Sequence, residues 1–165
     1  MQPRLLSDTH ELHMLGDELL AKLVMRGSNS ADAVCSDGSF TFQRKGLFKT
    51  HTVVYAGSSR APMATFEPSG NESALTFVDG HAARYLWRKL GVGNNEYVWA
   101  DSAGKAIVQF WPASAGTRAR VRFLAGAAQT QELALLVLLG SFLASLAKRD
   151  VLIPALAITM LNRNT

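Results

Sequence analysis

The sequence has few of the features that would mark a secreted protein or an enzyme. Of its 165 residues, one is cysteine (Cys35) and 18% are charged. A single cysteine excludes an internal disulfide framework and fits a reducing compartment. Residues 1–15 contain no continuous apolar stretch, so we expect no secretory signal. The predicted location is the cytoplasm, including the periphery of a membrane.

Motifs that carry chemistry are also missing. There is no G-x-S-x-G, so no Ser-His-Asp arrangement can be assembled from a motif. The glycines Gly91 and Gly93 end an expected strand and lack the rest of a dinucleotide fingerprint, so they indicate a turn. His10 and His13 have no cysteine nearby, and Cys35 has no basic neighbour. We therefore expect no enzyme, no metal and no cofactor.

The composition predicts one folded domain. Apolar residues make up 48% of the chain, enough for a substantial core. We expect residues 1–18 to be poorly ordered and residues 19–165 to form a single domain. Residues 19–26 fit a strand or a helix, and we favour the strand, whereas residues 28–38 have the composition of a loop.

From residue 39 onward, short segments rich in aromatic and β-branched residues alternate with polar turns. This spacing is typical of an antiparallel barrel or sandwich. Asp79 and Gly80 are a pair that closes two-residue hairpins. The expected strands are 39–43, 49–56, 62–67, 74–78, 83–89, 96–100, 105–111 and 118–125.

Residues 130–149 are predicted to form a helix that is apolar on every side between 133 and 147. Such a helix is enclosed by protein or by lipid. Its apolar part is about 22 Å long, short of the ~30 Å hydrocarbon core, and charged residues follow it. We therefore favour a buried core helix, with Thr130 as its cap, over a membrane anchor or membrane-surface helix. Residues 151–161, with Pro154, fit either a further helix or a closing strand.

Four segments carry a resemblance to a known group: 75–80 (LTFVDG), 84–89 (RYLWRK), 97–104 (YVWADSAG) and 107–110 (IVQF). Hairpins with this pattern, followed by one hydrophobic helix, resemble the tubby C-terminal-like superfamily. That group includes tubby domains, phospholipid scramblases and LURP-one-related proteins, and the likeness covers about residues 39–149. The resemblance implies a mainly β fold: an antiparallel β-barrel of about 10–12 strands enclosing its C-terminal helix.

The excess of positive charge lies in the last third of the chain. Up to Ser114, eleven Lys/Arg balance eleven Asp/Glu, and six Lys/Arg against two Asp/Glu follow. Arg118, Arg120 and Arg122 alternate with apolar residues, so a strand places them on one face, where they could bind phosphate oxygens. Arg84 and Arg88 share one face of another strand and are the second candidates. The alternative for both sets is a solvated outer face.

The partner predicted from these residues is an anionic membrane lipid. The resemblance agrees, because tubby domains bind phosphoinositide head groups through basic residues, although none of those residues can be aligned here. The alternatives are a protein-interaction or scaffold module and a carrier of a small apolar ligand. Specific nucleic-acid binding is not expected, because the aromatic residues fit a barrel core better than a base-stacking platform. These aromatics are Tyr85, Trp87, Tyr97, Trp99 and Phe110.

Overall fold

The computed structural model describes residues 9–13, 19–70, 72–80, 83–91, 96–112 and 119–161, with side chains between residues 21 and 148 of these ranges. The chain is mainly β, an antiparallel sheet followed by one long helix. The elements are β1 (Thr9–His13), β2 (Leu19–Arg26), β3 (Ser30–Cys35), β4 (Gly38–Lys45), β5 (His51–Ala56), β6 (Pro62–Glu67), β7 (Ser73–Phe77), β8 (Arg84–Leu90), β9 (Glu96–Ala100), β10 (Ala106–Trp111), β11 (Arg120–Phe123), the 3-10 turn η1 (Ala127–Gln129) and α1 (Leu133–Leu161).

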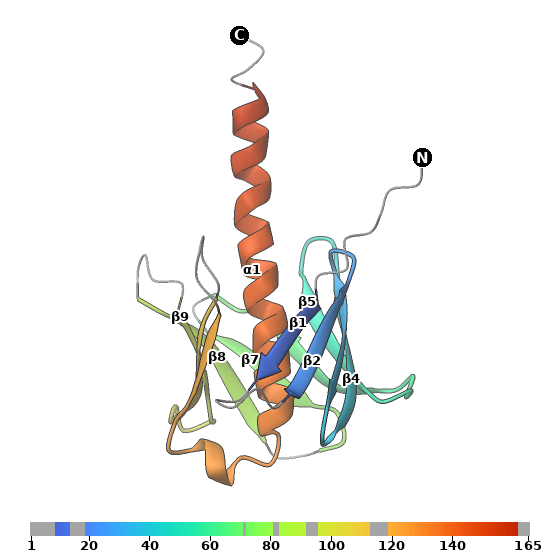
Figure 1. Ribbon diagram of the computed structural model, residues 1–165, viewed down its shortest axis with the longest axis vertical. Helices are drawn as coiled ribbons and strands as arrows, with labels where there is room; N and C mark the ends of the chain where they lie inside the picture. Colours follow the sequence, from blue (N-terminus) through green and yellow to red (C-terminus); the bar gives the residue numbers. More distant parts are fainter. Residues whose placement is uncertain are drawn as a thin grey trace.

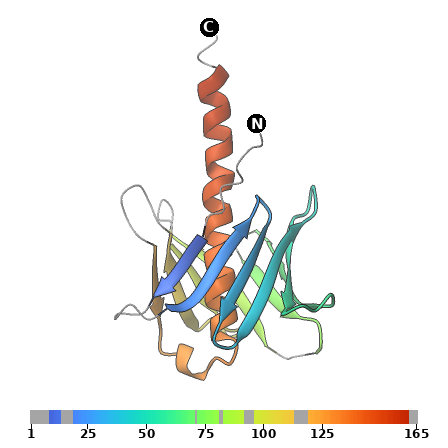
Figure 2. The same ribbon diagram turned by 45° about the vertical axis from the view of Figure 1, so that its right-hand side comes forward.

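The sheet has eleven strands in simple sequence order, each antiparallel to the next. It curves around the first half of α1, and the second half of α1 extends beyond the sheet (Figures 1 and 2). The expected closure into a barrel is not confirmed, because no pairing joins β1 to β11 among the described residues. Both edge strands are short, with five and four residues, and short edge strands that carry charge limit further pairing.

The core lies between the inner face of the sheet and α1. Inward side chains such as Phe42, Val54 and Leu75 have no exposed surface. On α1, the five consecutive residues 135–139 are between 0 and 6% exposed. Successive helix residues are turned by about 100°, so these five cover the whole circumference. The prediction of a buried core helix is therefore confirmed for this part of α1.

Small residues let α1 fit against the sheet. A Cβ atom on Gly140 would lie 2.5 Å from Phe110 Cζ and 2.8 Å from Trp99 Nε1, so both rings lie against the helix backbone. Ser141 donates its hydroxyl to the carbonyl of Val137 at 2.8 Å, and Ser145 does the same to Ser141 at 2.9 Å. These bonds satisfy the hydroxyl groups within the helix.

The start of α1 differs from the prediction. Thr130 does not cap the helix. Its hydroxyl instead donates to the carbonyl of Gly126, the residue that precedes η1, at 2.9 Å. The helix begins three residues later, and the carbonyl of Glu132 accepts the N–H of Leu136 at 3.0 Å. At the other end, α1 continues to Leu161, so the alternative of a closing strand at 151–161 is wrong.

Two local predictions fail elsewhere, at residues 28–38 and at the expected hairpin of Asp79 and Gly80. Residues 28–38 are not a loop but contain β3, in which Ala31 and Ala33 face the core with no exposed surface. Residues 9–13 form β1 by pairing with β2, and the poor order of residues 1–18 stays a prediction. Gly80 has the expected positive φ of 76°, but β7 ends at Phe77 and β8 begins at Arg84, so the connection is longer than a two-residue hairpin.

Candidate functional site

The best-placed cations of the predicted ladder lie on the outer face of the edge strand β11. Arg120 and Arg122 are exposed, whereas Val121 between them is paired with the buried Phe110. Both guanidinium groups lie over the ring of Trp111, at 5.5 and 5.7 Å from its centroid. Cation–π contacts of this kind hold the two side chains on one patch. Arg118, the first member of the predicted ladder, lies outside the described residues.

Neither Arg120 nor Arg122 forms a salt bridge within the part of the chain that the structure describes. Glu96 at the start of β9 instead accepts a hydrogen bond from Gln109 of β10, at 3.3 Å. Gln109 is the cross-strand neighbour of Arg122. The donor groups of both arginines are therefore available to an external anion.

The second candidates, Arg84 and Arg88, are not brought together with this patch, since β9 and β10 separate β8 from β11. Arg88 forms a salt bridge with Glu72, whose carboxylate accepts from both Nε and Nη2, at 3.0 and 2.7 Å. Arg88 thus forms a partly exposed ion pair on the outer face of the sheet. Arg84 is exposed at the start of β8.

The aromatic residues are core, as expected. Trp87 stacks on Tyr97 with their centroids 5.1 Å apart and an interplanar angle of 9°. It also contacts Trp99 at 4.9 Å and Phe110 at 5.3 Å. Trp99 is completely buried, so these rings offer no platform for stacking bases. The indole N–H of Trp99 has no hydrogen-bond partner among the described residues.

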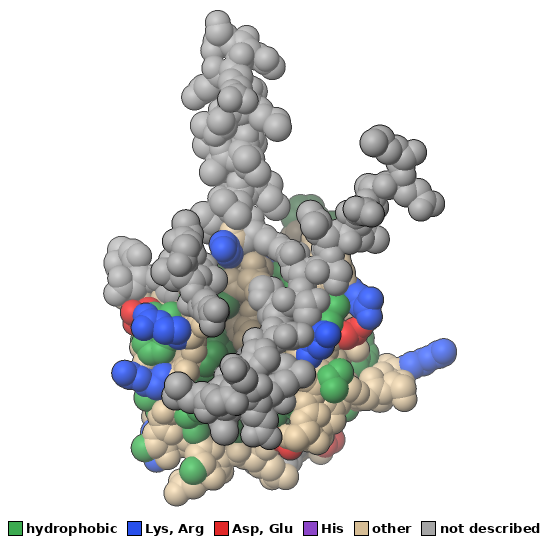
Figure 3. Space-filling view, in the orientation of Figure 1, with side chains coloured by type: hydrophobic (Ala, Val, Ile, Leu, Met, Phe, Trp, Pro, Cys, Tyr) green, Lys and Arg blue, Asp and Glu red, His purple; other side chains and the backbone are tan. Residues whose placement is uncertain are grey.

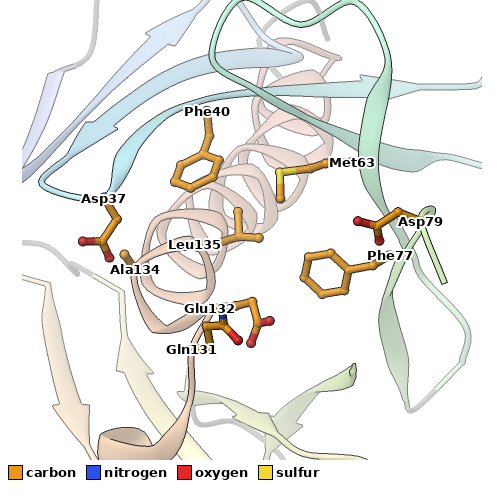
Figure 4. A pocket seen from close by; sticks show the side chains of 9 residues that line it. All are labelled: Asp37, Phe40, Met63, Phe77, Asp79, Gln131, Glu132, Ala134 and Leu135. Atoms are coloured by element: carbon orange, nitrogen blue, oxygen red, sulfur yellow. The ribbon is translucent and has the colours of Figure 1, made fainter. Parts of the chain in front are cut away.

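Two cavities flank α1, one at each end of the sheet. We call the end that holds Asp37, Asp79 and Glu132 the helix-start end; its cavity measures about 260 Å³. Figure 4 shows Phe40, Met63 and Phe77 around Leu135 of α1 in this cavity. We call the other end the helix-exit end; its cavity of about 250 Å³ lies between α1 and the strand ends. It is lined by Arg44, Thr50, His51, Thr52, Phe66, Pro68, Ser73, Trp87, Leu143, Leu146 and Ala147.

The volumes of both cavities are below the ~300–1,000 Å³ typical of small-molecule sites. The space that an empty sheet would offer is filled by α1. This geometry disfavours a carrier of apolar ligands.

A hydrogen bond joins α1 to the sheet at the helix-start end. The hydroxyl of Tyr85 on β8 donates to the carboxylate of Glu132, just before α1. Burial is the main cause that raises the pKa of Tyr85, and the hydrogen bond and negative charge of Glu132 raise it further. Tyr85 thus stays protonated and keeps donating at ordinary pH.

The loop between β4 and β5 is an exposed feature that was not predicted from the sequence. Leu47 and Phe48 have exposed fractions of 94% and 103%. In the sequence, two large apolar residues lie beside Gly46 and between lysines, a pattern that also suits the start of the next buried strand. The loop belongs to the helix-exit end, since Thr50 and His51 line the cavity there.

Within the described residues there is no group of three His, Cys, Asp or Glu side chains that could hold a metal ion. Cys35 is half-buried, and its thiol donates to the carbonyl of Gly38, at 3.5 Å. Among the described residues, no helix has both the length and the hydropathy needed to cross a membrane.

Comparisons with family models, curated proteins and solved structures found no match for the chain. The resemblance to the tubby C-terminal-like superfamily therefore stays a prediction.

Proposed function

We propose that the protein is a non-enzymatic, tubby-like protein that binds anionic phospholipid, including phosphoinositide, at a membrane surface. The observation that carries this proposal is the pair of guanidinium groups of Arg120 and Arg122. They are exposed, lie over one tryptophan ring and have no acidic partner among the described residues. Guanidinium groups suit phosphate oxygens because they present several donors in one plane.

The distribution of charge supports this proposal. Lys and Arg side chains lie along both flanks of the face drawn in Figure 3. Basic side chains near an anionic bilayer contribute about 1 kcal/mol each, an attraction that salt screens. A few such residues on one surface are enough for reversible peripheral binding.

Liposome co-sedimentation tests the proposal. We expect the protein to sediment with vesicles that contain phosphatidylserine and not with vesicles of phosphatidylcholine alone. The triple variant R118A/R120A/R122A removes three charges and should lower the apparent affinity about 100-fold at low salt. The control R60A/K105A removes two exposed cations from loops outside the candidate site and should change affinity less than about threefold.

Equal sedimentation of all variants with both vesicle types would discard recognition of anionic head groups by this arginine patch. A partner protein recovered with wild type, together with no preference for lipid, would instead favour a scaffold module.

In this proposal the chain is a tubby-like barrel in which β1 and β11 complete the wall around α1. The burial of consecutive α1 residues on all sides supports this closure. Amide hydrogen exchange tests it, because outward amides of both edge strands exchange slowly only if the strands are paired. Fast exchange of both strands would mean that the sheet stays open.

A further inference from the structure

The most exposed apolar side chains of the described part of the chain lie next to each other. Leu47 and Phe48 form the tip of the loop between β4 and β5, with exposed fractions of 94% and 103%. A single exposed apolar side chain needs no explanation. Two large ones at one loop tip, with almost none of their surface covered by the protein, suggest an external apolar partner.

The loop is built to hold this tip away from the sheet. Gly46 has a φ of +95°, and a Cβ atom there would clash with the carbonyl oxygen of Lys49. The backbone therefore turns tightly just before Leu47. Before the turn, the ammonium of Lys45 donates to the hydroxyl of Tyr55, at 2.7 Å, and lies 5.3 Å from its ring centroid.

The charges around the tip favour a negatively charged partner. Lys45 and Lys49 are exposed on either side of Leu47 and Phe48. Lys148 is exposed on α1, next to Ala147, which lines the cavity of the helix-exit end. An apolar tip between cations matches the boundary between anionic head groups and acyl chains.

The path of α1 favours the same orientation. The helix leaves the sheet at the helix-exit end and continues to Leu161 (Figures 1 and 2). The sequence of residues 151–161, VLIPALAITML, contains no charged residue. A bilayer that meets this end of the sheet thus also meets an uncharged helical segment that extends past the loop.

We propose that Leu47 and Phe48 insert into an anionic bilayer while Lys45 and Lys49 remain among the phosphates. This inference rests on the proposed function and adds which end of the molecule faces the lipid. A lipid surface fits better than a protein, because two side chains are far less than the ~800 Å² per partner of a specific interface. Shallow insertion of two side chains is enough to strengthen a contact that charge already provides.

Substitution at the tip gives the first test. We expect L47S/F48S to lower the apparent affinity for phosphatidylserine-containing vesicles about 10- to 100-fold, because two large side chains lose their apolar contact. The matched control V34S/V78S removes two other exposed apolar side chains, which are 56% and 61% exposed and lie near the helix-start end. It should change affinity less than about twofold.

A fluorescent probe gives a test that does not depend on loss of binding. In a C35S background, an environment-sensitive dye on F48C should shift its emission to the blue when phosphatidylserine-containing vesicles are added. The same dye on S58C, in the exposed turn between β5 and β6, should not shift. Phosphatidylcholine vesicles should shift neither.

The outcomes separate the two proposals. If wild type binds no anionic vesicle, the proposed function fails, and insertion fails with it. If wild type binds but L47S/F48S binds equally well and the dye does not shift, insertion is wrong while lipid binding by Arg120 and Arg122 stands. A shift that rises with protein concentration without vesicles would mean that the tip contacts a second copy, which also overturns insertion.

Discussion

At the helix-start end of the sheet, acidic side chains surround the first turn of α1, and a tyrosine hydroxyl binds one of them. At the helix-exit end, exposed basic side chains and an apolar loop tip lie where α1 leaves the sheet. The acidic residues are Asp37, Asp79 and Glu132, and the basic ones are Lys45, Lys49 and Lys148.

The helix-start end stabilises the fold, whereas the helix-exit end is the one that we expect to interact with a partner. Glu132 is joined to Tyr85, so a side chain of the helix-start end contributes to holding α1 in the sheet. Leu47 and Phe48 contribute almost no buried surface, so they add little to the stability of the fold. Their exposure lowers the solubility of the free protein. We therefore expect substitutions at the two ends to affect different measurements.

The largest effect is expected midway between the two ends, at Gly140. The substitution G140L places a side chain where Phe110 and Trp99 already lie against the helix. Overpacking without space to relax should lower the free energy of unfolding by at least about 3 kcal/mol, and both ends should lose their structure. Chemical denaturation measures the loss. The neighbouring S141A, which only removes a hydroxyl bonded to Val137, should stay within about 1 kcal/mol of wild type; equal stability of both variants would contradict the packing of α1.

The second largest effect is expected at the helix-exit end, on the affinity for anionic vesicles and not on stability. Neutralising the loop in K45Q/K49Q should weaken binding to anionic vesicles about 30-fold at low salt, at about 1 kcal/mol for each lysine. The stability of the variant should change little, because both residues are exposed. Co-sedimentation over a salt series measures the effect. The control R60Q/K105Q removes the same charge from exposed loop positions elsewhere, and an equal loss there would show that only net charge matters.

A smaller effect is expected from Tyr85 at the helix-start end. Y85F removes the donor to Glu132 and should cost about 1–3 kcal/mol of stability, typical of a hydrogen bond to a charged group. Because the pKa of Tyr85 is raised by burial and by Glu132, the folded state keeps its proton longer than the unfolded state does. Wild-type stability should thus fall as pH rises above the ordinary tyrosine pKa of about 10.

Thermal unfolding between neutral pH and pH 11 tests this dependence. The fall above pH ~10 should be shallower in Y85F than in wild type. If the two proteins lose stability in parallel, Tyr85 does not carry the pH dependence. Lipid binding at neutral pH should be the same in both.

The smallest effect is expected at Arg88. R88A breaks the ion pair with Glu72, and exposed pairs of this kind contribute at most about 1 kcal/mol. Binding to anionic vesicles should be unchanged, in contrast to the loss expected at Arg120 and Arg122. A clear loss of binding in R88A would show that the phosphate site extends to β8.

Much of the sheet could be predicted from sequence, because its strands alternate large apolar residues with polar ones. The strands after residue 50 were expected within a few residues, and the all-round apolarity of residues 133–147 correctly indicated an enclosed helix. The outward position of Arg120 and Arg122 followed from the same alternation. These predictions succeed where burial on one side dictates the residue type.

The remaining features depend on contacts that local composition does not reveal. β3 was missed because alanines serve as its core residues and small polar residues surround them, a composition that also suits a loop. The exposed Leu47 and Phe48 could not be distinguished from the buried residues of the next strand without the sheet. Closure of the sheet depends on β1 meeting β11, residues more than a hundred positions apart, which no local pattern determines.

Hydrogen exchange in the presence of phosphatidylserine-containing vesicles tests most directly which end of the molecule faces lipid. Peptides that cover residues 44–50 and 120–123 should become protected, whereas peptides from the helix-start end, at 57–61 and 101–105, should exchange as in the free protein. Protection confined to the helix-start end, or unchanged exchange throughout despite bound vesicles, would contradict docking through the helix-exit end.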